Sequence, residues 1–272
     1  MKIYISADME GISGIVSHAQ TMVEGRDYER ARYLMTREVN AVVEALIQHG
    51  ATEVVVNDSH NNMDNILIEE FHPGAVLISG SPKPLSMMQG IDESFDAVFF
   101  VGYHARPGIT QAIIDHTYVY RVLEAKINGK PMSEAGLNGR LAGYYGVPVA
   151  LVTGDQKTIL CAREELYEPV GVAVKEAIGR NSARIYPFNR VKELLNTGVA
   201  EAIKKLKSLQ PTVESGSIEL EVTFYLAEMA EMTLLIPGVR RKGGRTVCYT
   251  SDNYLELFKA FRAMLIITSA IK

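Results

Sequence analysis

The pattern of hydrophobic and polar positions alternates between short apolar runs typical of strands and the three- and four-residue spacing typical of helices. Residues 2–7 form a short apolar run, which predicts a strand. Between Tyr28 and Ile47, apolar residues recur at steps of three and four, and Gly50 follows as a stop signal, so we expect a long helix there. The β-branched run at 53–57 then predicts a second strand. Strand, helix and strand in this order are typical of a parallel sheet with crossover helices.

The same alternation continues to the end of the chain and predicts a two-part organisation. We expect an α/β fold with a metal-binding catalytic domain over residues 1–180, built on a mostly parallel central sheet with flanking helices. A second, smaller α/β domain is expected over residues 181–272, and the stretch 211–216 has the composition of a linker. The remaining expected strands lie at 75–78, 96–102, 117–127, 147–152, 218–224 and 246–250, with a hairpin turn at Asn128-Gly129 and helices at 134–145, 189–209 and 253–271.

Composition limits the classes of partner. The 272 residues are 47% hydrophobic and 22% charged, which suits a soluble globular protein with a large core. The net charge of −4 provides no basic surface to attract a nucleic acid or an anionic membrane, so we expect neither partner. Cys161 and Cys248 are too few for a disulfide framework, and the chain shows no secretory signal, so we expect a cytoplasmic protein.

Two acidic residues, Asp8 and Glu10, follow the first predicted strand. Side chains alternate along extended backbone, so both carboxylates leave the chain on the same face. Like charges this close are stable when a cation neutralises them or when one carboxyl keeps its proton. Gly11 would let the backbone turn sharply beneath an ion. The hexapeptide taken alone also fits a helix cap at Asp8 with Glu10 facing water.

Other metal-competent side chains follow other predicted strands. His60 comes after the second strand, His104 after the buried strand at 96–102, and Asp155 after the strand expected at 147–152. In open parallel sheets, ligands bind outside the carboxyl ends of the strands, so we expect these side chains and the acidic pair at one edge. Imidazoles and carboxylates without a thiolate favour Zn²⁺, with Mn²⁺, Co²⁺ or Fe²⁺ as alternatives.

Several histidines and acids keep more than one interpretation. His116 lies in the loop after the His104 strand and is either catalytic or structural. Asp155 also fits the N-cap of a helix that begins near residue 156, and Asp58 fits either a cap or a partner that orients a ligating imidazole. The other histidines have structural interpretations: His18 in a loop, His49 at a helix end and His72 before a proline.

Four motifs together resemble a known family. They are Ser6-Ala7-Asp8-Met9-Glu10-Gly11, Asn57-Asp58-Ser59-His60, Gly102-Tyr103-His104-Ala105-Arg106 and Glu134-Ala135-Gly136-Leu137-Asn138. Their order and spacing are similar to those of the zinc-dependent D-aminopeptidases of the M55 peptidase family. The resemblance is strong over residues 1–155 and weaker from there to the end of the chain.

The resemblance implies a dinuclear site and a large assembly. It implies two zinc ions per subunit, a further histidine as a catalytic group, and a ring-like homo-oligomer, a decamer, with active sites facing an inner channel. The segment 107–115 differs from the family pattern in length and composition, so the alignment is softest near the catalytic histidine. The implied ligands are Asp8 as the bridge, Glu10 and His60 in one site, and His104 and Glu134 in the other, with His116 as the implied catalytic residue.

The residues and the resemblance favour a metallo-aminopeptidase that hydrolyses the N-terminal amide bond of short peptides, especially D-amino-acid-containing ones. Two divalent ions supply the chemistry that amide hydrolysis requires. One alternative is a two-metal phosphoesterase, which would add basic residues near the metals, with Arg106 as the obvious candidate. The other alternative is a non-enzymatic peptide-binding protein of a transport system.

Overall fold

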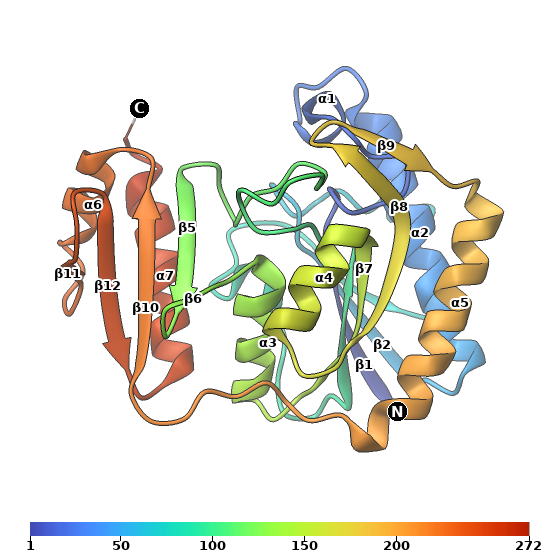
Figure 1. Ribbon diagram of the computed structural model, residues 1–272. Helices are drawn as coiled ribbons and strands as arrows, with labels where there is room; N and C mark the ends of the chain where they lie inside the picture. The colour runs from blue at the N-terminus through green and yellow to red at the C-terminus, as the bar shows by residue number, and fades with distance from the viewer. Residues whose placement is uncertain (272) are drawn as a thin grey trace.

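The computed structural model describes residues 1–271, which form two β-sheets with helices packed around them (Figure 1). The larger sheet has seven strands, all parallel to their neighbours except the last pair, which is antiparallel. The expected α/β fold with a mostly parallel sheet is therefore confirmed. Its strands are β1 (Lys2–Ala7), β2 (Glu53–Asp58), β3 (Val76–Ile78), β4 (Ala97–Val101), β7 (Val149–Asp155), β8 (Val170–Gly179) and β9 (Ser182–Ile185).

The order of these strands creates a switch point in the middle of the sheet. The order is β3-β2-β1-β4-β7-β8-β9, so the chain moves outward in one direction from β1 to β3 and in the other direction from β4 to β8. β1 and β4 lie side by side at this point, and such places bind ligands outside the carboxyl ends of the strands. The loops after these two strands carry Asp8 and His104.

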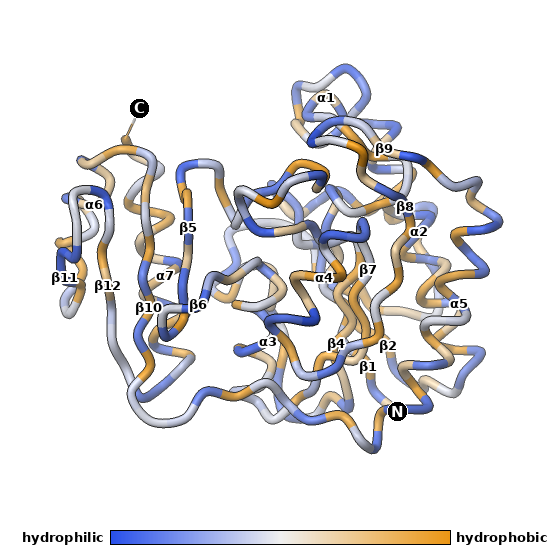
Figure 2. Tube along the Cα trace, viewed as in Figure 1, coloured by the Kyte–Doolittle hydropathy of each residue, from blue (hydrophilic) through white to orange (hydrophobic). Residues whose placement is uncertain are grey.

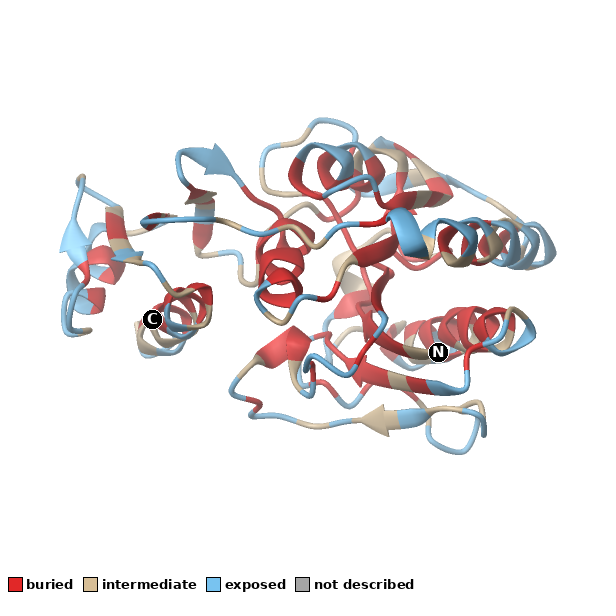
Figure 3. Cartoon of the chain, turned by 90° about the horizontal axis from the view of Figure 1, so that it is seen from below, coloured by how far each residue is buried: buried red, intermediate tan, exposed pale blue. Residues whose placement is uncertain are grey.

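Helices cover both faces of the larger sheet (Figure 1). One face packs against α2 (Tyr28–Gln48) and α5 (Phe188–Lys205), which also contact each other. The other face packs against α3 (Glu134–Tyr144) and α4 (Gln156–Glu165). In Figure 3, buried residues gather in the middle of the molecule and exposed residues lie along the outer sides of the helices. The three- and four-residue spacing that predicted α2 therefore corresponds to the face that it buries.

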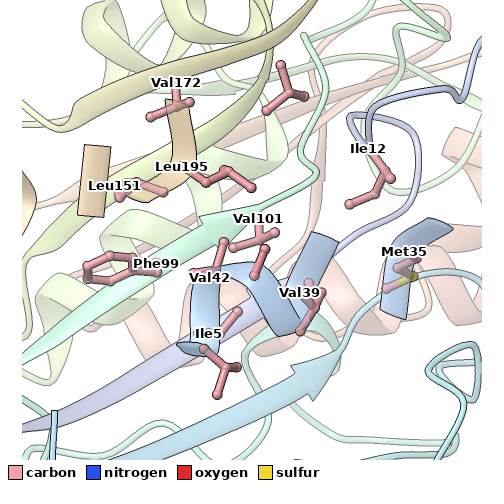
Figure 4. Close-up of a cluster of buried hydrophobic side chains, with 14 of the residues drawn as sticks. Ile5, Ile12, Met35, Val39, Val42, Phe99, Val101, Leu151, Val172 and Leu195 are labelled. Atoms are coloured by element: carbon pink, nitrogen blue, oxygen red, sulfur yellow. The ribbon is translucent and has the colours of Figure 1, made fainter. Parts of the chain in front are cut away.

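The alternation of side chains along β1 separates two hydrophobic cores. Ile3 and Ile5 point into the core beneath α2, whereas Tyr4 points into the core on the opposite face. Figure 4 shows part of the first core, in which Val39 and Val42 of α2 lie close to Ile5. Burial on both faces explains why β4 is hydrophobic along its length and β7 is hydrophobic over residues 149–152 (Figure 2).

The smaller sheet has five antiparallel strands. These strands are β5 (Val122–Ile127), β6 (Lys130–Pro131), β10 (Ile218–Phe224), β11 (Arg240–Arg241) and β12 (Thr246–Ser251). Their order is β11-β12-β10-β5-β6, and the predicted turn at Asn128-Gly129 joins β5 to β6. The helices α6 (Ala227–Thr233) and α7 (Tyr254–Thr268) pack on this sheet, and α7 also contacts α3. α7 therefore lies between the smaller sheet and α3, one of the helices that cover the larger sheet.

Sheet membership does not follow the order of the chain. β5 and β6 precede residue 180 and belong to the smaller sheet, whereas β9 and α5 follow it and belong to the larger one. The chain passes between the two sheets once more at 209–217, which includes the predicted linker (Figure 1). The division of the chain into domains at residue 180 stays a prediction.

Several strands differ from the expectation, since β6, β9 and β11 were not expected. The strand expected from residue 117 begins at Val122, because Tyr118 has a φ of +61° and its N–H binds the side chain of Glu134. The pattern analysis did not identify β8, whose apolar run contains the charged residues Lys175 and Glu176. Three short helices complete the fold: α1 (His18–Thr21), η1 (Ser86–Met88) and η2 (Leu206–Ser208). Within residues 1–271, no helix combines the length and the apolar character needed to cross a bilayer.

Candidate metal centre

Six of the side chains singled out in the sequence meet at the carboxyl edge of the larger sheet. They are Asp8 and Glu10 after β1, His60 after β2, His104 after β4, His116 between β4 and β5, and Glu134 at the start of α3. Ala7, the last residue of β1, pairs with Asp58 of β2 and with Val101 of β4. The loops that follow these three strands therefore begin side by side.

Two glycines allow these loops to cross at close range. The N–H of Asp8 donates to the carbonyl of Val101 at 2.8 Å, and that of Gly11 donates to the carbonyl of Gly102 at 2.7 Å. A Cβ on Gly11 would overlap the carbonyl oxygen of Tyr103, and one on Gly102 would overlap that of Asp8. Gly11 is therefore needed for the close approach of two backbones, a different reason from the sharp turn that the sequence suggested.

Asp8 lies between two pairs of an imidazole and a carboxylate. Its Oδ1 is 3.2 Å from Nδ1 of His60, and its Oδ2 is 3.4 Å from Nε2 of His104. Oε2 of Glu10 is 3.0 Å from the same nitrogen of His60. Oε1 of Glu134 is 3.2 Å from the same nitrogen of His104. One carboxylate therefore faces both pairs, each through a different oxygen.

One ring nitrogen of each imidazole is hydrogen-bonded to a backbone carbonyl oxygen. The contacts are His60 Nε2 to the carbonyl oxygen of Thr21 at 2.8 Å, His104 Nδ1 to that of Ala105 at 3.1 Å, and His116 Nδ1 to that of Ile114 at 2.9 Å. A carbonyl oxygen accepts and does not donate, so these nitrogens carry the ring proton. In a neutral ring, the other nitrogen then presents a lone pair to the carboxylates. Metal-ligating histidines are oriented in this way.

Buried atoms without hydrogen bonds mark the space between these groups. Within residues 1–271, Oδ2 of Asp8, Oε2 of Glu10 and Nε2 of His104 are buried and have no hydrogen-bond partner, although oppositely charged groups lie nearby. The three carboxylates are at most 3% exposed. Lone pairs that face one another in a buried site need a cation between them. Two overlapping groups have ligand atoms close enough to share an ion: Asp8, Glu10 and His104, and His104, His116 and Glu134. The residues present therefore fit a divalent metal with nitrogen and oxygen ligands.

The pKa values show how the site is charged when protons alone neutralise it. Burial and the neighbouring Glu10 raise the pKa of Asp8 to about 7. Burial opposes the charged form of His104, but Glu134 and the other carboxylates raise its pKa to about 10. Burial and the charge of His104 lower the pKa of His116 to about 4. In that state, His104 carries the proton and His116 is the uncharged imidazole of the stacked pair.

Asp155 has a structural role. Its Oδ1 accepts the N–H groups of Lys157 and Thr158, which makes it the N-cap of α4, and its Oδ2 accepts the N–H of Ile113. Both oxygens are thus occupied by the backbone. Of the two interpretations that the sequence left open for Asp155, the structure supports the helix cap.

Asp58 holds the loop that carries His60. Its Oδ2 accepts the N–H groups of Asn65 and Ile66 at 2.6 and 2.8 Å. The Nδ2 group of Asn65 donates to Oδ1 of Asp58 and to the carbonyl of His60, which closes the loop. Asp58 therefore positions the backbone of this loop, and the imidazole of His60 is oriented by Thr21 instead.

The sequence did not lead us to Lys175, whose side chain is hydrogen-bonded to the backbone of the loop after β1. Lys175 is fully buried, and its Nζ donates to the carbonyl oxygens of Glu10, Ile12 and Ile15 at 2.6, 2.9 and 2.7 Å. Burial lowers its pKa to about 8. The available signal was a lysine in the middle of an apolar run, because a fully buried lysine is rare unless it has partners.

Arg106 is occupied by neighbouring acids. Its Nη1 is 2.8 Å from Oε1 of Glu165, and its Nη2 is 3.0 Å from Oε2 of Glu164. The second oxygen of Glu165 accepts the N–H of Ser133, the N-cap of the helix that begins with Glu134. Arg106 therefore helps to fix the start of α3 and is not the phosphate-binding group considered for a phosphoesterase.

A cavity of about 560 Å³ opens over the candidate centre, a size typical of small-molecule sites. Asp8, Glu10 and His116 line one wall. Thr21 and Met22 also line it, so the segment after β1 borders the cavity. Residues 118–121, just before β5, and residues of α7 form the other wall, so the cavity lies between the larger sheet and α7.

Comparisons with known proteins agree with this geometry. The M55 peptidase family, described as D-aminopeptidase, matches residues 1–263. A D-aminopeptidase from Bacillus subtilis (strain 168) is 38% identical over 269 residues, which cover 98% of this chain and 97% of the relative. The solved structure of the Zn-dependent D-aminopeptidase DppA from Bacillus subtilis, described as a self-compartmentalizing protease, superposes with a TM-score of 0.96 at 36% identity, covering 99% of this chain and 98% of that one. The chain belongs to the M55 peptidase family of D-aminopeptidases.

Proposed function

We propose that this protein is a zinc-dependent aminopeptidase that hydrolyses the N-terminal amide bond of short peptides, with D-amino-acid-containing peptides as the preferred substrates. The observation that carries the proposal is the position of Asp8 between two imidazole–carboxylate pairs at the bottom of a cavity. The related Bacillus subtilis enzyme is described as Zn-dependent, which supports zinc as the metal. The same donor set also fits Mn²⁺ or Co²⁺.

The centre is proposed to hold two metal ions, with Asp8 as the shared ligand. Glu10 and His60 would complete one site, and His104 and Glu134 the other, as the contacts of each Asp8 oxygen indicate. When bound, two divalent ions would lower the pKa of a shared water and polarise the scissile carbonyl.

His116 is proposed as the group that moves the proton. Its ring stacks on that of His104, with centroids 4.0 Å apart, and Tyr120 packs near it at 4.7 Å. The carbonyl of Ile114 fixes the proton on Nδ1, so Nε2 has a free lone pair. In this position Nε2 would accept a proton as the amide is attacked and pass it to the leaving amine.

Hydrolysis of matched D- and L-dipeptides by metal-loaded protein tests the proposed activity. We expect release of the N-terminal residue, faster for the D-dipeptides, and no cleavage when the amino group is acetylated. Equal or faster cleavage of the L-peptides would contradict the stereochemical preference. Binding without turnover, or hydrolysis of a phosphate monoester in place of the peptides, would contradict the aminopeptidase.

The protein is also proposed to form a large homo-oligomer, a decamer, in the cytoplasm. The description of the Bacillus subtilis structure as self-compartmentalizing supports assembly. Ten chains of 30.0 kDa each would have a mass of about 300 kDa. Light scattering should therefore give a mass far above that of a dimer. A mass of a single chain at every protein concentration would contradict the assembly.

A further inference from the structure

The cavity over the candidate metal centre has walls of opposite charge. Asp8, Glu10 and Glu134 line the wall formed by the larger sheet. Arg121 and Arg262 line the wall formed by the smaller sheet and α7. Arg121 directly precedes β5, and Arg262 lies within α7. The proton transfer proposed for His116 uses neither arginine.

Among the residues that the structure describes, no carboxylate pairs with either arginine. Within residues 1–271, Nε of Arg262 is buried and has no hydrogen-bond partner. Its guanidinium lies 5.5 Å from the centroid of the Tyr118 ring, a contact that packs the group but brings no negative charge. Burial lowers the pKa of Arg121 and that of Arg262, and no carboxylate opposes either shift. A shielded cation without an anion is costly, so such a group is normally paired.

Arg121 is held in place by α7, close to Arg262 along the helix. Its Nε donates to Oγ1 of Thr268 at 3.0 Å, and its Nη2 donates to the carbonyl of Leu265 at 3.2 Å. Leu265 is one helical turn from Arg262. Both guanidinium groups therefore belong to the wall of the cavity that α7 forms, and two hydrogen bonds to α7 hold that of Arg121.

We propose, on the basis of the proposed aminopeptidase function, that Arg262 and Arg121 bind the free α-carboxylate of the peptide substrate. The amino end of the peptide then lies at the candidate metal centre, and the carboxyl end lies against α7. The planar fork of a guanidinium matches a carboxylate and binds it through paired hydrogen bonds. A short peptide with both ends free is complementary to both walls, so this contact selects for short substrates.

Kinetics with free and C-terminally amidated peptides test this proposal. We compare D-dipeptides and D-tripeptides with their amides, using metal-loaded protein. For the parent protein, we take whichever of the free D-dipeptide and D-tripeptide is the better substrate. Its kcat/KM should exceed that of its amide by about 10–100-fold, as expected for loss of a hydrogen bond to a charged group. In Arg262→Gln, KM for the free peptide should rise by about the same factor while kcat changes little, because this contact is equal in the ground state and the transition state. The kinetics of the amide should stay unchanged, and Arg262→Lys should be intermediate.

Arg37→Gln is the matched control. Nε of Arg37 is also buried without a hydrogen-bond partner, and its guanidinium stacks on Phe188 at 3.9 Å, but Arg37 lies on α2 and does not line the cavity. This variant should keep the preference of the parent for the free carboxylate. Loss of that preference in Arg37→Gln would show that the change follows from weaker packing and would overturn the proposal.

Other outcomes overturn the proposal in distinct ways. Equal cleavage of free and amidated peptides by the parent would mean that the carboxylate is not bound. A parallel loss of both activities in Arg262→Gln would indicate a structural role. Unchanged discrimination with an altered mass in light scattering would indicate that Arg262 binds an acidic group of a neighbouring subunit. Failure of the aminopeptidase function itself would look different, because the parent would cleave neither peptide.

Discussion

Replacing His116 with alanine is expected to lower turnover by about 10²–10⁴-fold while both metals stay bound, the usual effect of losing a positioned acid–base group. Nε2 of His116 is 3.7 Å from Oε1 of Glu134, farther than the nitrogens of His60 and His104 are from their carboxylates. Its ring is neutral and fixed by the carbonyl of Ile114. Single-turnover rates and metal content, measured on the same sample, test this expectation.

Three outcomes separate the roles of His116. A metal ligand would lose metal together with activity, and added zinc would restore part of the rate. A packing residue would leave turnover within a few-fold of the parent, which would contradict the catalytic role and direct attention to His18, whose Nδ1 is 3.2 Å from the hydroxyl of Tyr120. His49→Ala is the control. His49 follows α2 and contacts Asn196, and it does not line the cavity. The His49→Ala protein should therefore keep the parental rate.

Replacing Asp8 with alanine is expected to remove both metals and, with them, the peptidase activity. Each oxygen of Asp8 faces a different imidazole–carboxylate pair, so one substitution removes a ligand from both proposed sites. His60→Ala and His104→Ala should each weaken one site. Melting with and without zinc provides a second readout. At zinc concentrations about 100 times the dissociation constant, the parent should gain roughly 2.7 kcal/mol of stability for each ion bound, and the Asp8 variant should gain little.

Asp155→Asn is the matched control for Asp8. Asp155 is the last residue of β7, two strands away from β1 in the same sheet, but its oxygens bind the backbone of α4 and Ile113. The change should cost stability on the scale of a helix cap, about 1 kcal/mol, and leave metal content unchanged. An Asp8→Ala protein that kept one tightly bound zinc would contradict the shared role of Asp8.

Much of the metal centre could be predicted from the sequence because its residues follow strands that the pattern defines. Asp8, His60 and His104 each come within three residues of the end of a strand, and parallel strands bring such positions to one edge. Asp155 shows the limit of this rule. A carboxylate after a strand fits a helix cap as well as a metal ligand, and backbone contacts decide between them.

The parts that could not be predicted depend on contacts between distant segments. β5 follows β4 along the chain but pairs with β10 in the smaller sheet, and no local pattern in the sequence indicates that pairing. The side chain of Lys175 donates to the carbonyl oxygen of Glu10, and the carbonyl oxygen of Thr21 binds His60. The spacing of residues in the sequence does not indicate contacts of this kind. Arg121 and Arg262 line the cavity because α7 packs beside the site. Their role therefore emerges from the tertiary structure alone.

A zinc titration of metal-free protein, followed by hydrolysis of a D-dipeptide, tests the central claim most directly. The structure indicates two imidazole–carboxylate pairs joined by Asp8, so activity should rise until two zinc ions are bound per chain, with elemental analysis giving the same ratio. Activity that saturates at one zinc ion per chain, with no second ion bound, would contradict the dinuclear centre.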